Sequence, residues 1–163
     1  MIGGINLFAQ QQNSPERFGR TFNIGLGIGG YSGYYGYIGH TLPVLHVDYE
    51  LDAARNFTLA PFLTFYSYRD NYYRESVIPM GVKGSYYLDH LLGANSNWDF
   101  YLAGSLGFSL TTIVWDEGHD GDYHSGSPLF LDFHLGAEYH LNNMIGLFLD
   151  LSTGVSTVGL SIH

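Results

Sequence analysis

The segment between residues 116 and 124 holds the densest group of possible metal ligands in this sequence. Carboxylates and imidazoles follow one another closely there: Asp116, His119, Asp120, Asp122 and His124. Closely spaced carboxylates favour Ca²⁺, whereas imidazoles favour Zn²⁺ or Cu²⁺. The spacing lacks the glutamate that closes an EF-hand loop. The alternative is a hydrated surface loop without a metal, and no organic cofactor is predicted.

A second set of ionisable residues alternates with apolar residues along several segments. Its members are His46, Asp48, Glu50, Lys83, Asp132, His134, Glu138 and Asp150. Lys83 is the only base expected among them, and folding the hairpins places it near the height of Glu50 and Glu138. Such a group satisfies charges that are costly when buried alone. One interpretation is a network that fills and orders an interior. The other is a cation-preferring or proton-responsive path, because acids are in excess and His134 can titrate near neutrality.

Nucleophilic catalysis needs a serine, a histidine and an acid in one place. Asp150 and Ser152 share a face, with His134 nearby, but polar faces produce such coincidences often. The spacing assembles no convincing catalytic group, so the sequence predicts no catalytic residue and no enzyme.

These polar residues lie on predicted β-strands. In residues 129–153, Leu131, Phe133 and Leu135 alternate with Asp132 and His134, and the alternation resumes after Asn142-Asn143. A period of two places successive side chains on opposite faces of a strand, and Asn-Asn suits a tight turn. The pattern recurs along the chain and predicts eight strands, at residues 21–29, 44–52, 56–68, 76–88, 98–115, 129–140, 145–152 and 157–163.

The composition excludes several classes of protein. Only 13% of the 163 residues are charged, whereas 17% are aromatic. So few charges would coat a soluble surface poorly. The net charge of −9 argues against a nucleic-acid partner. The absence of cysteine excludes disulfides and thiolate metal sites, and no apolar run is long enough for a transmembrane helix.

Three features indicate that the apolar face points outward, to lipid. The polar face is rich in Gly, Ser and Thr, which suits the narrow interior of an eight-stranded barrel. The longer polar connections fall mainly at one end, as in outer-membrane barrels. Aromatic residues gather at both strand ends, as in membrane-interface girdles. The predicted girdles are Tyr86, Trp98, Phe100 and Tyr139 at one end, and Tyr31, Tyr66, Tyr68, Tyr73 and Trp115 at the other.

With these features the chain resembles the small eight-stranded outer-membrane barrels of Gram-negative bacteria, of the OmpA/OmpX and opacity-protein type. Residues 21–163 are expected to form the barrel, and residues 1–20 a signal-peptide remnant or a flexible N-terminal tail. Phe8-Ala9-Gln10 and the high Tyr content resemble proteins of the Bacteroidetes. Members of the family usually end in an aromatic residue, and this sequence departs from that pattern with His163.

The resemblance implies an all-β, closed, antiparallel, up-and-down transmembrane barrel in the bacterial outer membrane. The leading functional hypothesis is a monomer with a packed polar lumen and a structural or surface-interaction role through its extracellular loops. Its expected partners are outer-membrane lipid and an extracellular ligand or envelope component. The alternatives are a narrow cation-preferring channel, a lipid-modifying outer-membrane enzyme and, with the apolar face turned inward, a soluble ligand-binding barrel.

Overall fold

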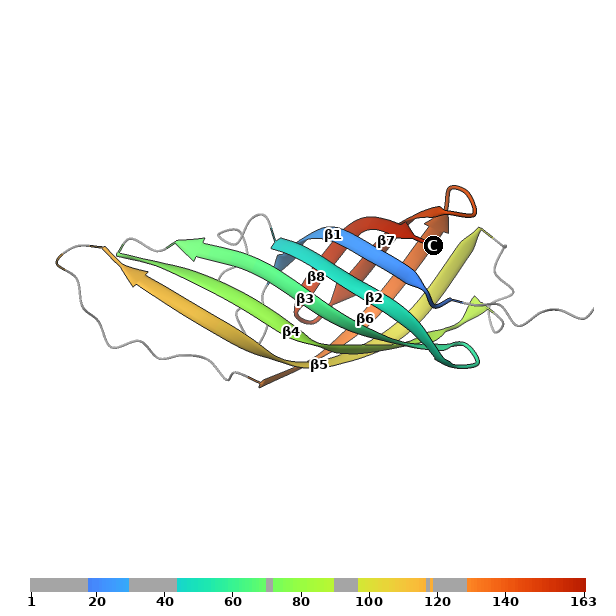
Figure 1. Ribbon diagram of the computed structural model, residues 1–163, viewed down its shortest axis with the longest axis horizontal. Coiled ribbons are helices and arrows are strands. Elements are labelled where there is room, and N and C mark those ends of the chain that lie inside the picture. The colour runs from blue at the N-terminus through green and yellow to red at the C-terminus, as the bar shows by residue number, and fades with distance from the viewer. Residues whose placement is uncertain (1–17, 30–43, 70–71, 90–96, 117, 119–128) are drawn as a thin grey trace, which may run out of the picture.

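The strands of the chain close into one antiparallel barrel (Figure 1). The computed structural model describes residues 18–29, 44–69, 72–89, 97–116, 118 and 129–163. Each strand pairs with the next along the chain, and the last returns to the first, so the predicted fold is confirmed. The strands are β1 (Thr21–Gly29), β2 (Val44–Ala54), β3 (Phe57–Arg69), β4 (Tyr73–Tyr87), β5 (Trp98–Trp115), β6 (Leu129–His140), β7 (Ile145–Ser152) and β8 (Val155–Ile162).

The strands lie close to their predicted positions because the alternation is strong enough to fix them. β1 and β5 have the predicted bounds, whereas β2 continues to Ala54. A register shift between Asp52 and Ala54 carries β2 into the turn, where Asn56 adopts a positive φ of 57°. Asparagine tolerates that conformation better than most residues.

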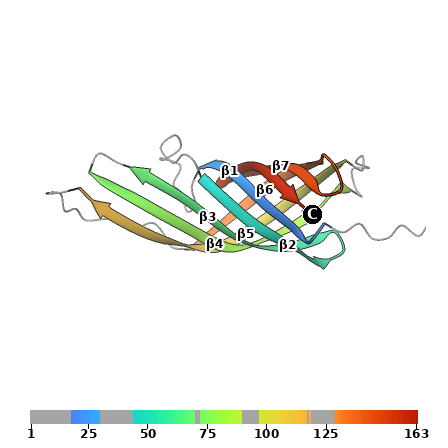
Figure 2. The ribbon, with the colours of Figure 1, turned by 45° about the horizontal axis from the view of Figure 1, so that its top comes forward.

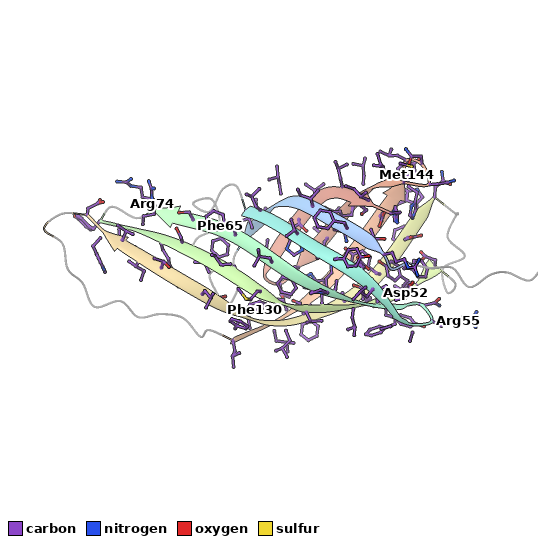
Figure 3. All side chains as sticks on the ribbon, in the orientation of Figure 1. Asp52, Arg55, Phe65, Arg74, Phe130 and Met144 are labelled. Carbon is purple, nitrogen blue, oxygen red and sulfur yellow. The ribbon has the colours of Figure 1, made fainter. Side chains whose placement is uncertain are left out.

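Large apolar side chains cover the outside of the barrel (Figure 3). Leu106, Leu131 and Phe133 are 64%, 61% and 65% exposed, and similar residues alternate along every strand. A continuous apolar exterior of this kind is incompatible with water, because soluble proteins rarely expose apolar patches above a few hundred Å². The outward-facing apolar side chains are therefore lipid-facing, as the sequence predicts.

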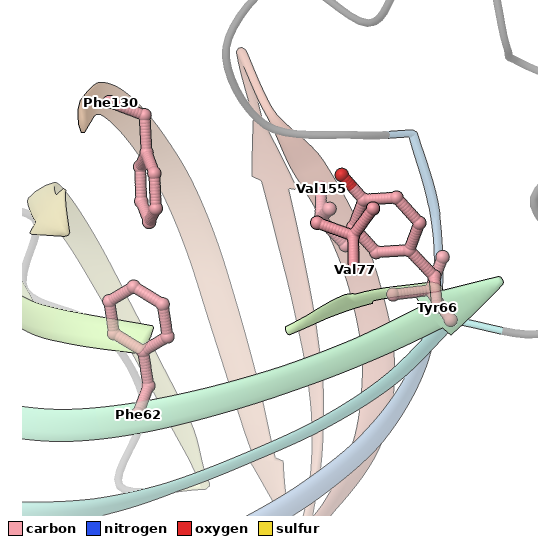
Figure 4. Close-up of a cluster of buried hydrophobic side chains, with 6 residues drawn as sticks. Phe62, Tyr66, Val77, Phe130 and Val155 are labelled. Atoms are coloured by element: carbon pink, nitrogen blue, oxygen red, sulfur yellow. The ribbon is translucent and has the colours of Figure 1, made fainter. Parts of the chain in front are cut away.

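The lumen contains two clusters of apolar and aromatic side chains and a set of buried ionised groups. One cluster consists of Phe18, Tyr87, Tyr101 and Ala103, and a second of Val44, Phe62, Tyr66, Val77, Phe130 and Val155. Figure 4 shows Phe62 facing Phe130 across the second cluster, and their ring centroids are 6.1 Å apart. Buried ionised groups lie in the same interior. The predicted packed polar lumen therefore also contains two clusters of apolar and aromatic side chains.

Three strands extend beyond the rest of the barrel at the end remote from the C-terminus (Figures 1 and 2). Ser67 pairs with Ser76, and Ser76 with Thr112, in one row across β3, β4 and β5. On the outward face, this row consists of small hydroxyl residues, and beyond it on β5 Val114 is again apolar and exposed. We call residues 67–69, 73–76 and 112–115 the projecting sheet, and the opposite end of the barrel the terminal end.

The outer edge of the projecting sheet belongs to β5. The pairing of β5 with β6 ends at Phe108 and Leu129, whereas its pairing with β4 continues to Trp115. No described strand pairs with the outer edge of β5 from Ser109 onward. A strand edge without a partner offers backbone donors and acceptors to another chain.

The last residues of the predicted N-terminal tail are attached to the barrel. Phe18 is buried and stacks on Tyr87, with ring centroids 4.0 Å apart. The Gly19 backbone N–H donates to Asp52, and the Arg20 N–H donates to the Glu50 carbonyl. Residues 1–17 lie outside the described part of the chain. No described helix is long and apolar enough to cross a membrane.

Candidate functional site

A buried lysine joins two sides of the lumen. The Lys83 ammonium on β4 lies 3.1 Å from the Asp48 carboxylate on β2 and 3.5 Å from that of Asp150 on β7. It also lies 5.6 Å from the centre of the Tyr101 ring. The predicted neighbours Glu50 and Glu138 are not its ion-pair partners. The reason is strand shear, since inclined strands bring diagonal neighbours, rather than residues in register, to the same height.

Two histidines extend this ion pair across the barrel. His134 Nδ1 lies 2.7 Å from Asp150 Oδ1, and its Nε2 lies 2.9 Å from Ser105 Oγ. Opposite, His46 Nε2 lies 3.1 Å from Asp48 Oδ2, and its Nδ1 lies 2.7 Å from Thr64 Oγ1. Every ring nitrogen of the two histidines thus has a partner, and the chain of contacts crosses from β5 to β3.

The arrangement of Ser105, His134 and Asp150 has the connectivity of a hydrolase triad. Sequence spacing could not reveal it, because the three residues lie on β5, β6 and β7 and the serine is 29 residues from the histidine. All three side chains are buried. The cavity beside them measures about 10 Å³ and is bordered by His46, Lys83 and Thr157 among others. That is room for about one water molecule and not for an acyl substrate.

Glu50 is held by neutral donors. Thr58 Oγ1 and Tyr87 Oη each donate to Glu50 Oε2 at 2.7 Å, and Asn23 donates to both Glu50 and Asp48. Asp132 is buried apart from this group and accepts from Thr153 Oγ1 at 3.1 Å. The structure therefore places His46, Asp48, Lys83, His134 and Asp150 in one network, joined to Glu50 through Asn23. Neither Asp132 nor Glu138 makes an ion pair with Lys83.

Glu138 belongs to a separate cluster at the terminal end. Its Oε1 lies 2.7 Å from His163 Nε2 and 3.9 Å from His140 Nδ1, and His140 Nε2 lies 2.8 Å from Asp99 Oδ2. The hydrogen bond to Glu138 raises the pKa of His163 above its ordinary value. Asp99, His140 and His163 were missed in the sequence, because these residues meet only when β5, β6 and β8 pack around one opening.

The predicted metal ligands of the acidic segment are not brought together by the described structure. Asp116 is exposed and pairs with Arg69 at 3.6 Å, a contact of little energetic weight at a hydrated surface. His119, Asp120, Asp122 and His124 lie outside the described residues. A metal site in this segment therefore stays a prediction.

The four residues predicted for one girdle lie together at the terminal end. Tyr86 and Trp98 are exposed on the outward face, and the Trp98 ring lies 5.8 Å from that of Phe100 and 4.9 Å from that of Tyr139. These rings suit the boundary between lipid tails and water.

At the other end the girdle prediction is wrong for the residues whose side chains are described. Tyr66 is 1% exposed and belongs to the lumen cluster, because it shares the inward face of β3 with Phe62 and Thr64. Tyr73 and Trp115 lie on the inward face of their strands and contact each other, with centroids 5.1 Å apart. Tyr31 and the Tyr68 side chain are outside the described part.

A larger hollow lies on the outside of the barrel. It measures about 390 Å³ and is bordered by Leu26, Ile28, Leu149, Leu151 and Val158, with small residues of β1 and β8 between them. Its lining is almost wholly apolar and carries no ionisable group. The hollow is part of the lipid-facing surface.

Comparison with solved structures identifies the fold. A computationally designed transmembrane β-barrel aligns with a TM-score of 0.52 at 9% identity, covering 90% of this chain and 98% of that one. The chain has the fold of a transmembrane β-barrel. Neisserial surface protein A aligns with a TM-score of 0.55 at 14% identity, covering 87% and 94% of the two chains. The attachment invasion locus protein Ail of Yersinia pestis aligns with a TM-score of 0.49 at 10% identity, covering 87% and 94%.

Comparisons based on sequence found no relative. No protein-family model matches it, and no curated protein matches it. The resemblance to Bacteroidetes proteins is not tested by these findings.

Proposed function

We propose that this chain is a bacterial outer-membrane barrel that binds an extended peptide segment of another protein through its projecting sheet. The observation that carries the proposal is the edge of β5, which continues past the last residue paired with β6. Strand addition to such an edge gives affinity through backbone hydrogen bonds. The fold shared with neisserial surface protein A supports a place in the outer membrane.

The orientation follows from the connections. At the terminal end, β2 joins β3 through a turn at Arg55 and Asn56, and β6 joins β7 through residues 141–144. The longest connections, residues 30–43 and 116–128, fall at the end with the projecting sheet. Outer-membrane barrels keep short turns in the periplasm and longer loops outside the cell. The projecting sheet then faces the extracellular medium, and a single closed barrel needs no second copy.

The filled lumen supports surface interaction over transport or catalysis. A cation path would have to pass the Lys83 network and both buried clusters, whereas the cavity beside the network holds about 10 Å³. The triad-like group of Ser105, His134 and Asp150 borders that same small cavity, so a lipid substrate does not reach it. The inward residues of the Lys83 network and of the two buried clusters therefore act as a structural core, and the projecting end is the surface that binds another protein.

A pair of matched variants tests the edge. Thr112→Lys places a charge on the edge strand, and charged side chains on edges oppose strand addition. Ser76→Lys places the same charge in the same row on β4, which is paired on both sides. The barrel in lipid nanodiscs is used to select from a phage library of random linear peptides. We expect selected peptides to bind the original protein and the Ser76→Lys variant but to lose binding to Thr112→Lys.

Two outcomes would overturn the proposal. One is the absence of any peptide enriched above empty nanodiscs. The other is equal loss of binding in both lysine variants, since this would place the contact on the face of the sheet rather than on its edge.

A further inference from the structure

We propose that the terminal end of the barrel binds one divalent transition-metal ion, of which Zn²⁺ is the best match, through Glu138, His140 and His163. One ligand atom of each residue lies within 4.8 Å of those of the other two. Two imidazoles and a carboxylate form a ligand set that zinc accepts, and three protein ligands leave a fourth position for water. The site is separate from the proposed extracellular function.

The contacts around His163 favour a neutral ring whose Nε2 offers a lone pair toward Glu138. Thr21 Oγ1 donates its only proton to the Phe18 carbonyl at 3.1 Å. The same oxygen lies 3.0 Å from His163 Nδ1, so it is placed to accept from that nitrogen. In the tautomer with the proton on Nδ1, His163 Nε2 carries a lone pair and lies 2.7 Å from Glu138 Oε1. Two acceptors at that distance need a proton or a metal ion between them.

His140 also directs one ring nitrogen toward Glu138. Its Nε2–H donates to the Asp99 carboxylate at 2.8 Å, which leaves Nδ1 unprotonated and facing Glu138 Oε1 at 3.9 Å. Metal-binding histidines generally donate their second ring N–H to a carboxylate, carbonyl or water that fixes the tautomer. Asp99 and Thr21 thus act as orienting partners, and both free nitrogens converge on one carboxylate oxygen.

The spacing and access of the group suit a small ion. Zinc bonds to nitrogen and oxygen are about 2.0–2.2 Å long, so ligand atoms on one ion lie roughly 3–4 Å apart. The distance of 3.9 Å falls within that spacing, and the distance of 2.7 Å is slightly shorter than it. The side chains of His140 and His163 are 24% and 23% exposed, so an ion reaches them from solvent, whereas Glu138 is buried.

The backbone also makes room for the central carboxylate. Gly146 on β7 lies against Glu138, and a Cβ at that position would clash with Glu138 Oε1. Only glycine leaves the carboxylate where it faces both rings. The ligands come from β6 and from the residue after β8, and Thr21 opens β1, so a bound ion would tie together strands beside the seam where the barrel closes.

Calorimetric titration of the folded full-length chain with ZnCl₂ in detergent tests the site at one fixed pH. We expect one Zn²⁺ per barrel, with binding lost in His140→Ala and in Glu138→Gln. Asp99→Asn, which removes an orienting partner, is expected to weaken binding by about 10–100-fold. The control is His119→Ala combined with His124→Ala in the acidic segment, which should leave binding unchanged.

Folding of every variant is checked by gel mobility before and after heating, so that loss of binding is not mistaken for loss of the barrel. Failure of the folded original chain to bind Zn²⁺ would overturn the proposal. So would binding that survives in folded His140→Ala, or binding that disappears in the control and thereby belongs to the acidic segment.

Discussion

Replacing Lys83 with methionine is expected to lower the free energy of unfolding by about 3–5 kcal/mol, because it leaves buried carboxylates without their cation. Asp48 and Asp150 are 3% and 2% exposed, and Lys83 lies within 3.5 Å of both. Lys83 is the single lysine of the sequence, and no described arginine faces the lumen. The measurement is urea unfolding of the barrel in lipid vesicles.

A triple variant separates the loss of charge pairing from the loss of packing. Lys83→Met combined with Asp48→Asn and Asp150→Asn removes the cation and both anions together. Replacing a whole buried ion group is often neutral, whereas removing one partner is not. We expect the triple variant to recover most of the lost stability. A loss below about 1 kcal/mol for Lys83→Met alone would show that the ion pairs do not hold the lumen together.

Leu106→Arg is expected to destabilise the barrel by about 2–4 kcal/mol, since an arginine near the bilayer midplane must leave water. Leu106 is 64% exposed on the outward face of β5, midway along the apolar stretch from Leu102 to Leu110. In a soluble protein, replacing a leucine that is this exposed with arginine would change the free energy of unfolding only slightly. Refolding into vesicles followed by urea unfolding measures the difference.

The control is Thr112→Arg on the same face of the same strand. Thr112 lies in the row of Ser67 and Ser76 at the base of the projecting sheet, so arginine there is expected to cost about 0–1 kcal/mol, as near the interface. Equal effects of the two substitutions would mean that the outward face of β5 does not pass from lipid to water between Leu106 and Thr112.

The barrel could be predicted because its signal is local. Alternation in segments such as Leu129–His140 fixes both the strand and its lipid face, since every second side chain is apolar and points to the same side of the sheet. The inward position of Lys83, His134 and Asp150 follows from the same alternation. The network itself does not, because strand shear decides which inward residues share a height.

The packing role of Tyr66 and the partners of Ser105 and His163 could not be predicted from the alternation of apolar and polar residues. Tyr66 was assigned to a girdle from its place near a strand end, but its inward position makes it a packing residue of the lumen. Ser105 contacts His134 and His163 contacts Glu138, at sequence separations of 29 and 25 residues. Only the closed barrel brings such residues together.

The most direct test of the account compares folding with and without detergent micelles. We expect a β-rich species whose gel mobility changes on heating, formed with micelles or vesicles and absent in plain buffer, because the outward leucines and phenylalanines require an apolar surrounding. A folded, monodisperse protein in buffer alone would contradict it, since the apolar face would then have to lie inside.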